Sequence, residues 1–183
     1  LTGTFNDGEQ LLSNIVFTRD PRLYESVIVN GLPGNLGWSS VSVGGDPYEL
    51  WVGGSHAGSN SFNETMRYAT GYENMKYYLG SSDYLRQNTQ WVALRLSDLY
   101  LTYAEALLQA NNDHQGAVDQ IDIVRARVGL PGLVQSNPGK RLLTDKDALI
   151  EELLRERVCE LGMEDSRFFD LIRYKRADRF EKQ

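Results

Sequence analysis

The sequence predicts a mainly α-helical protein whose first half is a long irregular segment with short strands. Apolar residues recur at helical spacing in three stretches after residue 88, at 89–110, 115–128 and 145–161. In contrast, eight of the 17 glycines lie between Gly31 and Asn60. A glycine inside a helix costs about 1 kcal/mol relative to alanine, so this part of the chain is expected to form loops.

The irregular segment, residues 1–88, contains a few local signals of regular structure. The triplet at residues 20–22, Asp-Pro-Arg, is expected to start a turn or a short helix. Residues 24–29 and 66–79 are candidate short strands.

Residues 89–131 are expected to form a pair of antiparallel helices. The first, at 89–110, is apolar nearly all round and is expected to be buried on most sides. A polar break follows, and the second helix runs over 115–128 until Gly129 and Pro131 stop it. Such a pair resembles one tetratricopeptide-type repeat. Because a single repeat does not stand alone, it is expected to stack on others upstream.

Residues 144–180 are expected to form the last helices. Thr144 is the expected N-cap of a helix at 145–161, which Gly162 ends. A final helix is expected from residue 166 or 167 to about residue 180.

The segment 155–174 mixes charges of both signs with apolar residues. An unpaired buried charge costs several kcal/mol, so we expect a helix, a turn and a second helix clamped by internal ion pairs. The expected members of this network are Glu156, Arg157, Glu160, Glu164, Arg167, Asp170 and Arg173. On this interpretation Arg167→Ala lowers the free energy of unfolding by roughly 3–5 kcal/mol.

The same segment resembles the C-terminal signature of the SusD/RagB family, which reads roughly E-R-x-x-E-L-x-x-E-x-x-R-x-x-D-L-x-R-W. Tyr174 stands in place of the usual Trp, Asp165 where the family usually has Gly, and Gly162 where it often has Ala. Two further segments, 95–109 and 124–131, resemble other family motifs in the same order, and the Asp-Pro-Arg triplet resembles an element found upstream of them.

The resemblance implies that residues 1–183 are the C-terminal portion of a larger helical-repeat protein. It implies a surface-exposed lipoprotein of the bacterial outer membrane, typical of Bacteroidota. Such a protein captures a glycan or similar nutrient without cleaving it and delivers it to a SusC-type TonB-dependent transporter. The resemblance implies an N-terminal lipid anchor as the only membrane attachment, and this anchor is expected to lie outside residues 1–183. No cofactor is implied.

The residues themselves suggest where a glycan would bind. Trp38, Tyr48 and Trp51 lie in the glycine-rich segment. An exposed aromatic ring stacks on the apolar face of a sugar, and loops often carry binding residues. These three residues are therefore the candidate ligand contacts.

Other classes of function find little support. Net charge is −6, which argues against nucleic acid as a partner. No apolar run is long enough to span a membrane. The single cysteine, Cys159, is expected to be a buried, inert thiol. His56 and His114 have no partner at metal-ligand spacing and are expected at the surface, and the sequence specifies no calcium site.

Two alternatives to glycan capture remain open. A helical-repeat scaffold that binds only protein would use the apolar helix at 89–110. A glycoside hydrolase would need two carboxylates across a cleft, and Glu156 with Glu160 or Glu164 with Asp170 are the pairs available. Because neighbouring arginines are expected to neutralise these carboxylates, the sequence predicts no catalytic residue.

Overall fold

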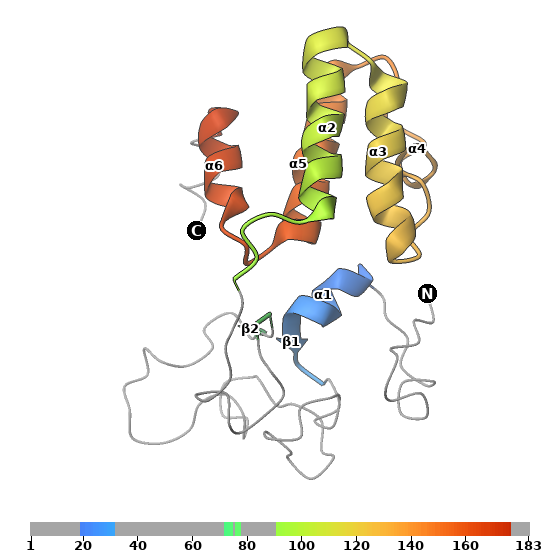
Figure 1. Ribbon diagram of the computed structural model, residues 1–183. Coiled ribbons are helices and arrows are strands. Elements are labelled where there is room, and N and C mark those ends of the chain that lie inside the picture. The colour runs from blue at the N-terminus through green and yellow to red at the C-terminus, as the bar shows by residue number, and fades with distance from the viewer. Residues whose placement is uncertain (1–18, 32–71, 75, 78–90, 177–183) are drawn as a thin grey trace, which may run out of the picture. The chain divides into compact units, whose positions relative to one another are not determined.

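The computed structural model describes residues 19–31, 72–74, 76–77 and 91–176 (Figure 1). The chain divides into two compact units, residues 1–91 and 92–183, and each is considered by itself. None of the helices in the described residues is long and apolar enough to cross a membrane.

In the first unit, a short helix leads directly into a strand. The helix α1 spans Pro21–Ser26, and the Asp20 carboxylate caps it by accepting a hydrogen bond from the backbone N–H of Arg22 at 3.0 Å. The strand β1, Val27–Val29, pairs antiparallel with β2, Tyr72–Asn74. The short helix begins where the sequence predicts it, and β2 lies within the candidate strand 66–79. The candidate strand at 24–29 is only partly correct, because residues 24–26 belong to α1 and only 27–29 form β1.

The second unit is helical (Figure 1). Helix α2, Leu96–Asn111, and helix α3, His114–Arg127, form an antiparallel pair, and α5, Lys146–Leu161, packs against both. The short helix α4, Leu133–Ser136, packs on α3, and α6, Ser166–Arg173, packs on α5. The helix pair at 89–131 and the C-terminal helices are therefore present.

A single apolar core joins α2, α3 and α5. Its buried residues come from all three helices and from the segment between α3 and α5. They are Leu101, Ala104, Leu108, Ala117, Val118, Ile121, Val124, Leu133, Leu142, Leu149, Ile150, Leu153, Leu154 and Leu161. The spacing of these residues follows one face of each helix, which is why the three helices fold together.

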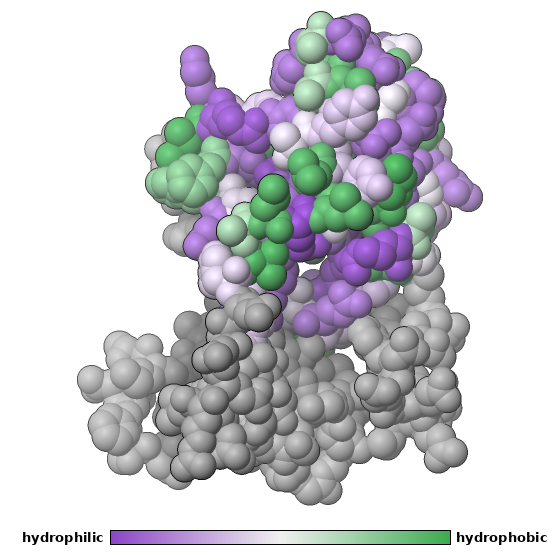
Figure 2. Space-filling view, in the orientation of Figure 1, coloured by the Kyte–Doolittle hydropathy of each residue, from purple (hydrophilic) through white to green (hydrophobic). Residues whose placement is uncertain are grey.

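The expectation that α2 is buried on most sides is wrong. The helix begins at Leu96, because residues 91–95 are not helical and Arg95 is extended. Of its apolar side chains, Leu96, Leu99 and Tyr103 are exposed. Figure 2 shows apolar surface over α2 and at α6. Apolar composition does not show which positions contact a neighbouring element. Among the described residues, α3 and α5 contact α2, and the buried residues of α2 are Leu101, Ala104 and Leu108.

Two helix ends differ from those that the sequence predicts. Asp145, rather than Thr144, caps α5 by accepting from the backbone N–H of Ala148 at 3.1 Å. Helix α6 ends at Arg173 instead of continuing to residue 180. The expected stop after α3 is present, since Gly129 has φ +71°, a left-handed conformation that glycine adopts without strain.

Candidate functional site

The charged residues of α5 meet arginines from the other helices. Glu160, fully buried, accepts from Arg95 at 2.6 Å and from Arg127 at 3.1 Å. Arg95 also donates to Glu164 at 2.9 Å. Burial lowers the pKa of the Arg95 guanidinium, but its hydrogen bonds to Glu164 and Glu160 outweigh that effect and leave the pKa raised. Glu160 thereby ties the start of α2 and the end of α3 to α5.

A second cluster ties α3 to α5 and α4. The guanidinium of Arg125 donates to the Glu156 carboxylate at 2.8 Å, and both side chains are nearly buried. Its remaining N–H groups donate to the Pro131 carbonyl at 3.0 Å and to the Ser136 hydroxyl at 2.8 Å. The buried Arg125 guanidinium is therefore stabilised by hydrogen bonds to neutral oxygens as well as by its counter-ion Glu156.

A third cluster joins α5, α6 and α2. Arg157 donates to Asp170 at 2.8 Å and to Asp98 at 3.1 Å. Asp170 also accepts from Arg173 at 2.8 Å, and Arg173 pairs with Glu105. Partial burial lowers the pKa of Arg173, but its bonds to Glu105 and Asp170 outweigh this, so its pKa is raised.

Arg167 lies apart from this network, in contrast to the expectation from the sequence. It forms no ion pair with any residue that the structure describes. The reason is geometric: Arg157 and Arg173 hold the Asp170 carboxylate, and Arg95 holds Glu164. The other six expected members all form ion pairs.

Most ion pairs of the network join the segment 155–174 to other parts of the chain, whereas the sequence predicts pairs within the segment. The ion pairs of Asp170 with Arg157 and Arg173 lie within residues 155–174, whereas those of Glu156, Glu160 and Glu164 with described residues reach outside this segment. The charge pattern of the segment did not predict the other ion-pair partners, which are Arg95, Asp98, Glu105, Arg125 and Arg127. A signal for them existed, because all five lie in the segments 95–109 and 124–131 that carry the family resemblance.

The carboxylates proposed for glycoside hydrolysis are all engaged in these pairs. Glu156, Glu160, Glu164 and Asp170 each accept from at least one guanidinium at 3.1 Å or less. Carboxylates held in this way act as structural counter-ions, whereas glycoside hydrolysis needs one carboxyl group as an acid and another facing the sugar. The arrangement therefore favours a structural role for them.

The described part of the first unit holds one aromatic feature that could contact a ligand. The rings of Tyr77 and Trp91 stack with centroids 4.8 Å apart at an angle of 20°. Trp91 is 57% exposed, so a large part of its indole faces solvent. A flat, exposed ring held by a second ring is suited to stacking on a sugar. Trp38, Tyr48 and Trp51 lie outside the described residues.

The remaining candidate groups are the two histidines and the single cysteine. His114 is buried and not at the surface, in contrast to the expectation, since it is 8% exposed. Its Nδ1 lies 2.9 Å from the Asn112 carbonyl oxygen at the start of α3. His56 lies outside the described residues, and Cys159 is half-buried instead of fully buried. No group of three or more His, Cys, Asp or Glu in the described ranges could hold a metal ion.

The second unit belongs to the class of helical bundles, and buried arginine–carboxylate pairs hold its helices together. The model of the SusD family matches residues 3–183. The chain therefore belongs to the SusD family, whose members are known as non-catalytic nutrient-binding proteins.

Two solved structures resemble the chain. One is a SusD-like protein (BF3747) from Bacteroides fragilis NCTC 9343, with a TM-score of 0.63 and 27% sequence identity over 86% of this chain. The other, named BT4246, has a TM-score of 0.61 and 24% identity over 88% of this chain, and it supports the fold alone. The chain spans 28% and 26% of the lengths of these proteins. Comparison with curated proteins returned no match.

The departure from the family signature at Asp165 has a structural explanation. Asp165 has φ +60°, in the left-handed region, at the turn between α5 and α6. Glycine enters this region without a Cβ penalty, whereas Asp is among the few other residues that tolerate it. Asp165 therefore adopts a left-handed turn conformation that is also accessible to glycine.

Proposed function

We propose that this protein captures a glycan or similar nutrient at the surface of the outer membrane and passes it to a SusC-type transporter. The observation that carries the proposal is the family match across residues 3–183. The second unit supports it as a rigid scaffold, because buried ion pairs connect α2, α3, α5 and α6. Capture and transfer require no bond cleavage, so no catalytic residue is assigned.

The ligand contacts proposed here are aromatic. Trp91, stacked on Tyr77, is added to the candidates Trp38, Tyr48 and Trp51 that the sequence predicts. Stacking of an aromatic ring on the C–H face of a sugar is the expected contact. The glycan is therefore sought with a panel of soluble polysaccharides.

The test is retardation of the full chain in gels that contain soluble polysaccharides, followed by calorimetry on those that bind. We expect Trp91→Ala, Trp38→Ala or Trp51→Ala to weaken binding. The matched control is Tyr103→Ala, which removes an exposed aromatic ring from α2 in the other unit. Binding that survives all three tryptophan substitutions would refute the aromatic site, and no binding to any glycan would count against a glycan as the nutrient.

A protein-binding scaffold is the second candidate, and the exposed apolar side chains of α2 favour it. Leu96, Leu99 and Tyr103 recur at helical spacing on one side of the helix. The scaffold function predicts binding to a transporter protein by a chain that binds no glycan, which the same gels and a co-purification experiment would show.

A further inference from the structure

One exposed face of α2 carries apolar side chains and no charge. Its apolar and aromatic members, called the α2 stripe, are all exposed and are Leu96, Leu99, Tyr103, Ala106 and Ala110. The neutral polar side chains of Thr102 and Gln109 flank the stripe and are also exposed. Figure 2 shows apolar surface over α2. Apolar surface that runs the length of a helix is a candidate for contact with another protein segment.

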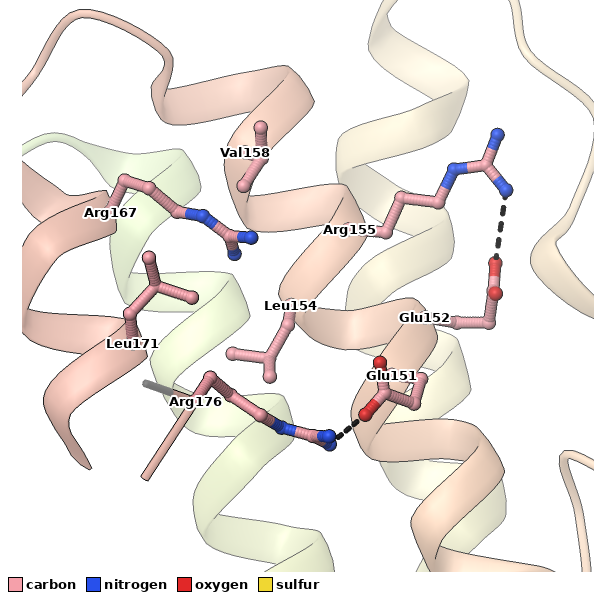
Figure 3. Close-up of a pocket in the computed structure, with 8 residues that line it drawn as sticks. All are labelled: Glu151, Glu152, Leu154, Arg155, Val158, Arg167, Leu171 and Arg176. Atoms are coloured by element: carbon pink, nitrogen blue, oxygen red, sulfur yellow. Dashed lines mark ion pairs between the residues drawn. The ribbon is translucent and has the colours of Figure 1, made fainter. Parts of the chain in front are cut away.

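The carboxylates of α2 are already bound within the chain's own bundle. Asp98 accepts from Arg157 of α5 at 3.1 Å, and Glu105 pairs with Arg173 of α6. The pocket of about 260 Å³ between α5 and α6 differs from the α2 stripe, because charged groups of both signs line it (Figure 3). These are Glu151, Glu152, Arg155, Arg167 and Arg176. The α2 stripe therefore offers a partner apolar contact but no counter-charge.

The spacing of the α2 stripe indicates what kind of element covers it. Its positions are separated by three, four, three and four residues, which is the a/d pattern of a coiled coil. This pattern keeps one row of side chains against a facing helix, so the expected occupant is an α-helix with an apolar row of its own. The buried residues of α2, Leu101, Ala104 and Leu108, fall between the stripe positions, and α3 and α5 are the helices that pack on α2.

We propose that the α2 stripe joins two copies of this chain as an antiparallel pair of α2 helices around a twofold axis. The stripe has large side chains in its first half, including Leu99 and Tyr103, and small ones in its second half, Ala106 and Ala110. In the antiparallel pair, Leu99 faces the partner's Ala110 and Tyr103 faces the partner's Ala106. Each layer then combines a large side chain with a small one, which fills the interface without overpacking.

A parallel pair of α2 helices fits less well. Tyr103 would then face the partner's Tyr103, and Ala106 would face the partner's Ala106. Crowded and empty layers would alternate, and both overpacking and cavities destabilise an interface. The order of large and small residues along the stripe therefore selects an antiparallel copy.

The distribution of charge also favours a second copy as the occupant. The net charge of −6 opposes the approach of two copies through charged surfaces. The antiparallel pair avoids this repulsion, because only neutral groups meet and Thr102 lies beside the partner's Gln109. A partner that binds through charge would find no complementary group on this face. A twofold dimer needs a single self-complementary surface, and the α2 stripe supplies one. The inference does not rest on the glycan proposal.

The first experiment measures the mass of the full chain by analytical ultracentrifugation. A single helix pair is a small interface, so the measurement covers concentrations from about 5 to about 500 µM. We expect the mass to rise with concentration from 20.7 kDa toward twice that value. In dilute solution the chain is a monomer, and Tyr103 is exposed there.

A charge placed in the stripe should prevent this association. Ala106→Glu is expected to weaken dimerisation at least about tenfold, because it would bury carboxylates that have no counter-charge. The matched control is Ala126→Glu, the same substitution at an exposed position of α3, which should leave dimerisation unchanged. Circular dichroism of each variant shows whether its helices are intact.

Cysteine cross-linking tests the orientation of the two helices. The background is Cys159→Ser, which removes the single native thiol. We expect a mixture of Leu99→Cys chains and Ala110→Cys chains to cross-link in a glutathione redox buffer, and each variant alone to cross-link far less. A chain that stays monomeric throughout the concentration range would overturn the proposal. Dimerisation that Ala106→Glu leaves intact, or cross-linking mainly of each cysteine variant with itself, would overturn it as well.

Discussion

Arg157 and Asp170 form a buried ion pair that joins α5 to α6. The Arg157 Nε donates to an Asp170 carboxylate oxygen at 2.8 Å, and the two side chains are only 7% and 3% exposed. Asp98 of α2 and Arg173 of α6 complete the cluster. A buried ion pair at the centre and two more exposed charges therefore connect the three helices.

Replacement of Asp170 by asparagine tests this arrangement. We expect Asp170→Asn to lower the free energy of unfolding by roughly 3–5 kcal/mol, because it leaves the Arg157 guanidinium buried with too little compensating charge. Urea denaturation measures the change. The matched control is Arg141→Ala, which removes an exposed partner 3.9 Å from Asp145 and should cost less than about 0.5 kcal/mol. Equal decreases in the free energy of unfolding for Asp170→Asn and Arg141→Ala would mean that burial of the Arg157–Asp170 pair does not increase its effect on stability.

Arg167 should behave differently from Arg157, although both are expected from the sequence to be network residues. Because Arg167 forms no ion pair with the described residues, Arg167→Ala should lower the free energy of unfolding by less than about 1 kcal/mol. Arg157→Ala should cost roughly 3–5 kcal/mol. Thermal or urea denaturation of the two variants, measured in parallel, tests whether their losses of stability differ in this way. A decrease of roughly 3–5 kcal/mol in the free energy of unfolding of Arg167→Ala would instead support the expectation from the sequence.

Gly129 ends α3 in a conformation that other residues adopt at a cost. Its φ is +71°, and a Cβ at this position would meet no atom within 4 Å. Gly129→Ala should therefore destabilise the protein through backbone strain alone, by about 1–2 kcal/mol. Gly139→Ala is the matched control, since that glycine also has open space and lies outside the left-handed region. Calorimetric unfolding of both variants provides the comparison, and similar midpoints would contradict the strain argument.

Tyr174 should make stability depend on pH in the alkaline range. Burial raises the pKa of Tyr174 to about 12, and the nearby Glu105 carboxylate adds to the effect. The folded state therefore holds the phenol proton more tightly than the unfolded state, whose ordinary value is 10.0. The stabilisation is fully present below pH 10 and is lost as the pH rises through about 12.

The measurement for Tyr174 is urea denaturation at several pH values for the parent chain and for Tyr174→Phe. The difference in free energy of unfolding between the two should shrink from pH 10 toward pH 12. Tyr103→Phe, in which an exposed tyrosine of α2 is replaced, is the control. A difference that stays constant over this range would show that the Tyr174 phenol is solvated.

Local signals predicted the helices well, and longer-range packing accounts for the errors. Asp20, Asp113 and Asp145 accept backbone hydrogen bonds at the starts of α1, α3 and α5, and such caps depend only on nearby residues. In contrast, the apolar residues of α2 gave no indication that Leu96 and Leu99 would be exposed, because their burial depends on which neighbours pack against the helix.

By itself, the sequence determined the mainly helical class, the family and the order of the helices. These features rest on apolar periodicity, capping residues and short motifs, all of which act within a few turns of the chain. The tertiary structure decided which charges pair: Glu160 binds Arg95 and Arg127, which lie 65 and 33 residues away in the sequence. Ion pairs form between groups close in space, and only the packing of α2, α3 and α5 brings these side chains together while leaving Arg167 facing a pocket.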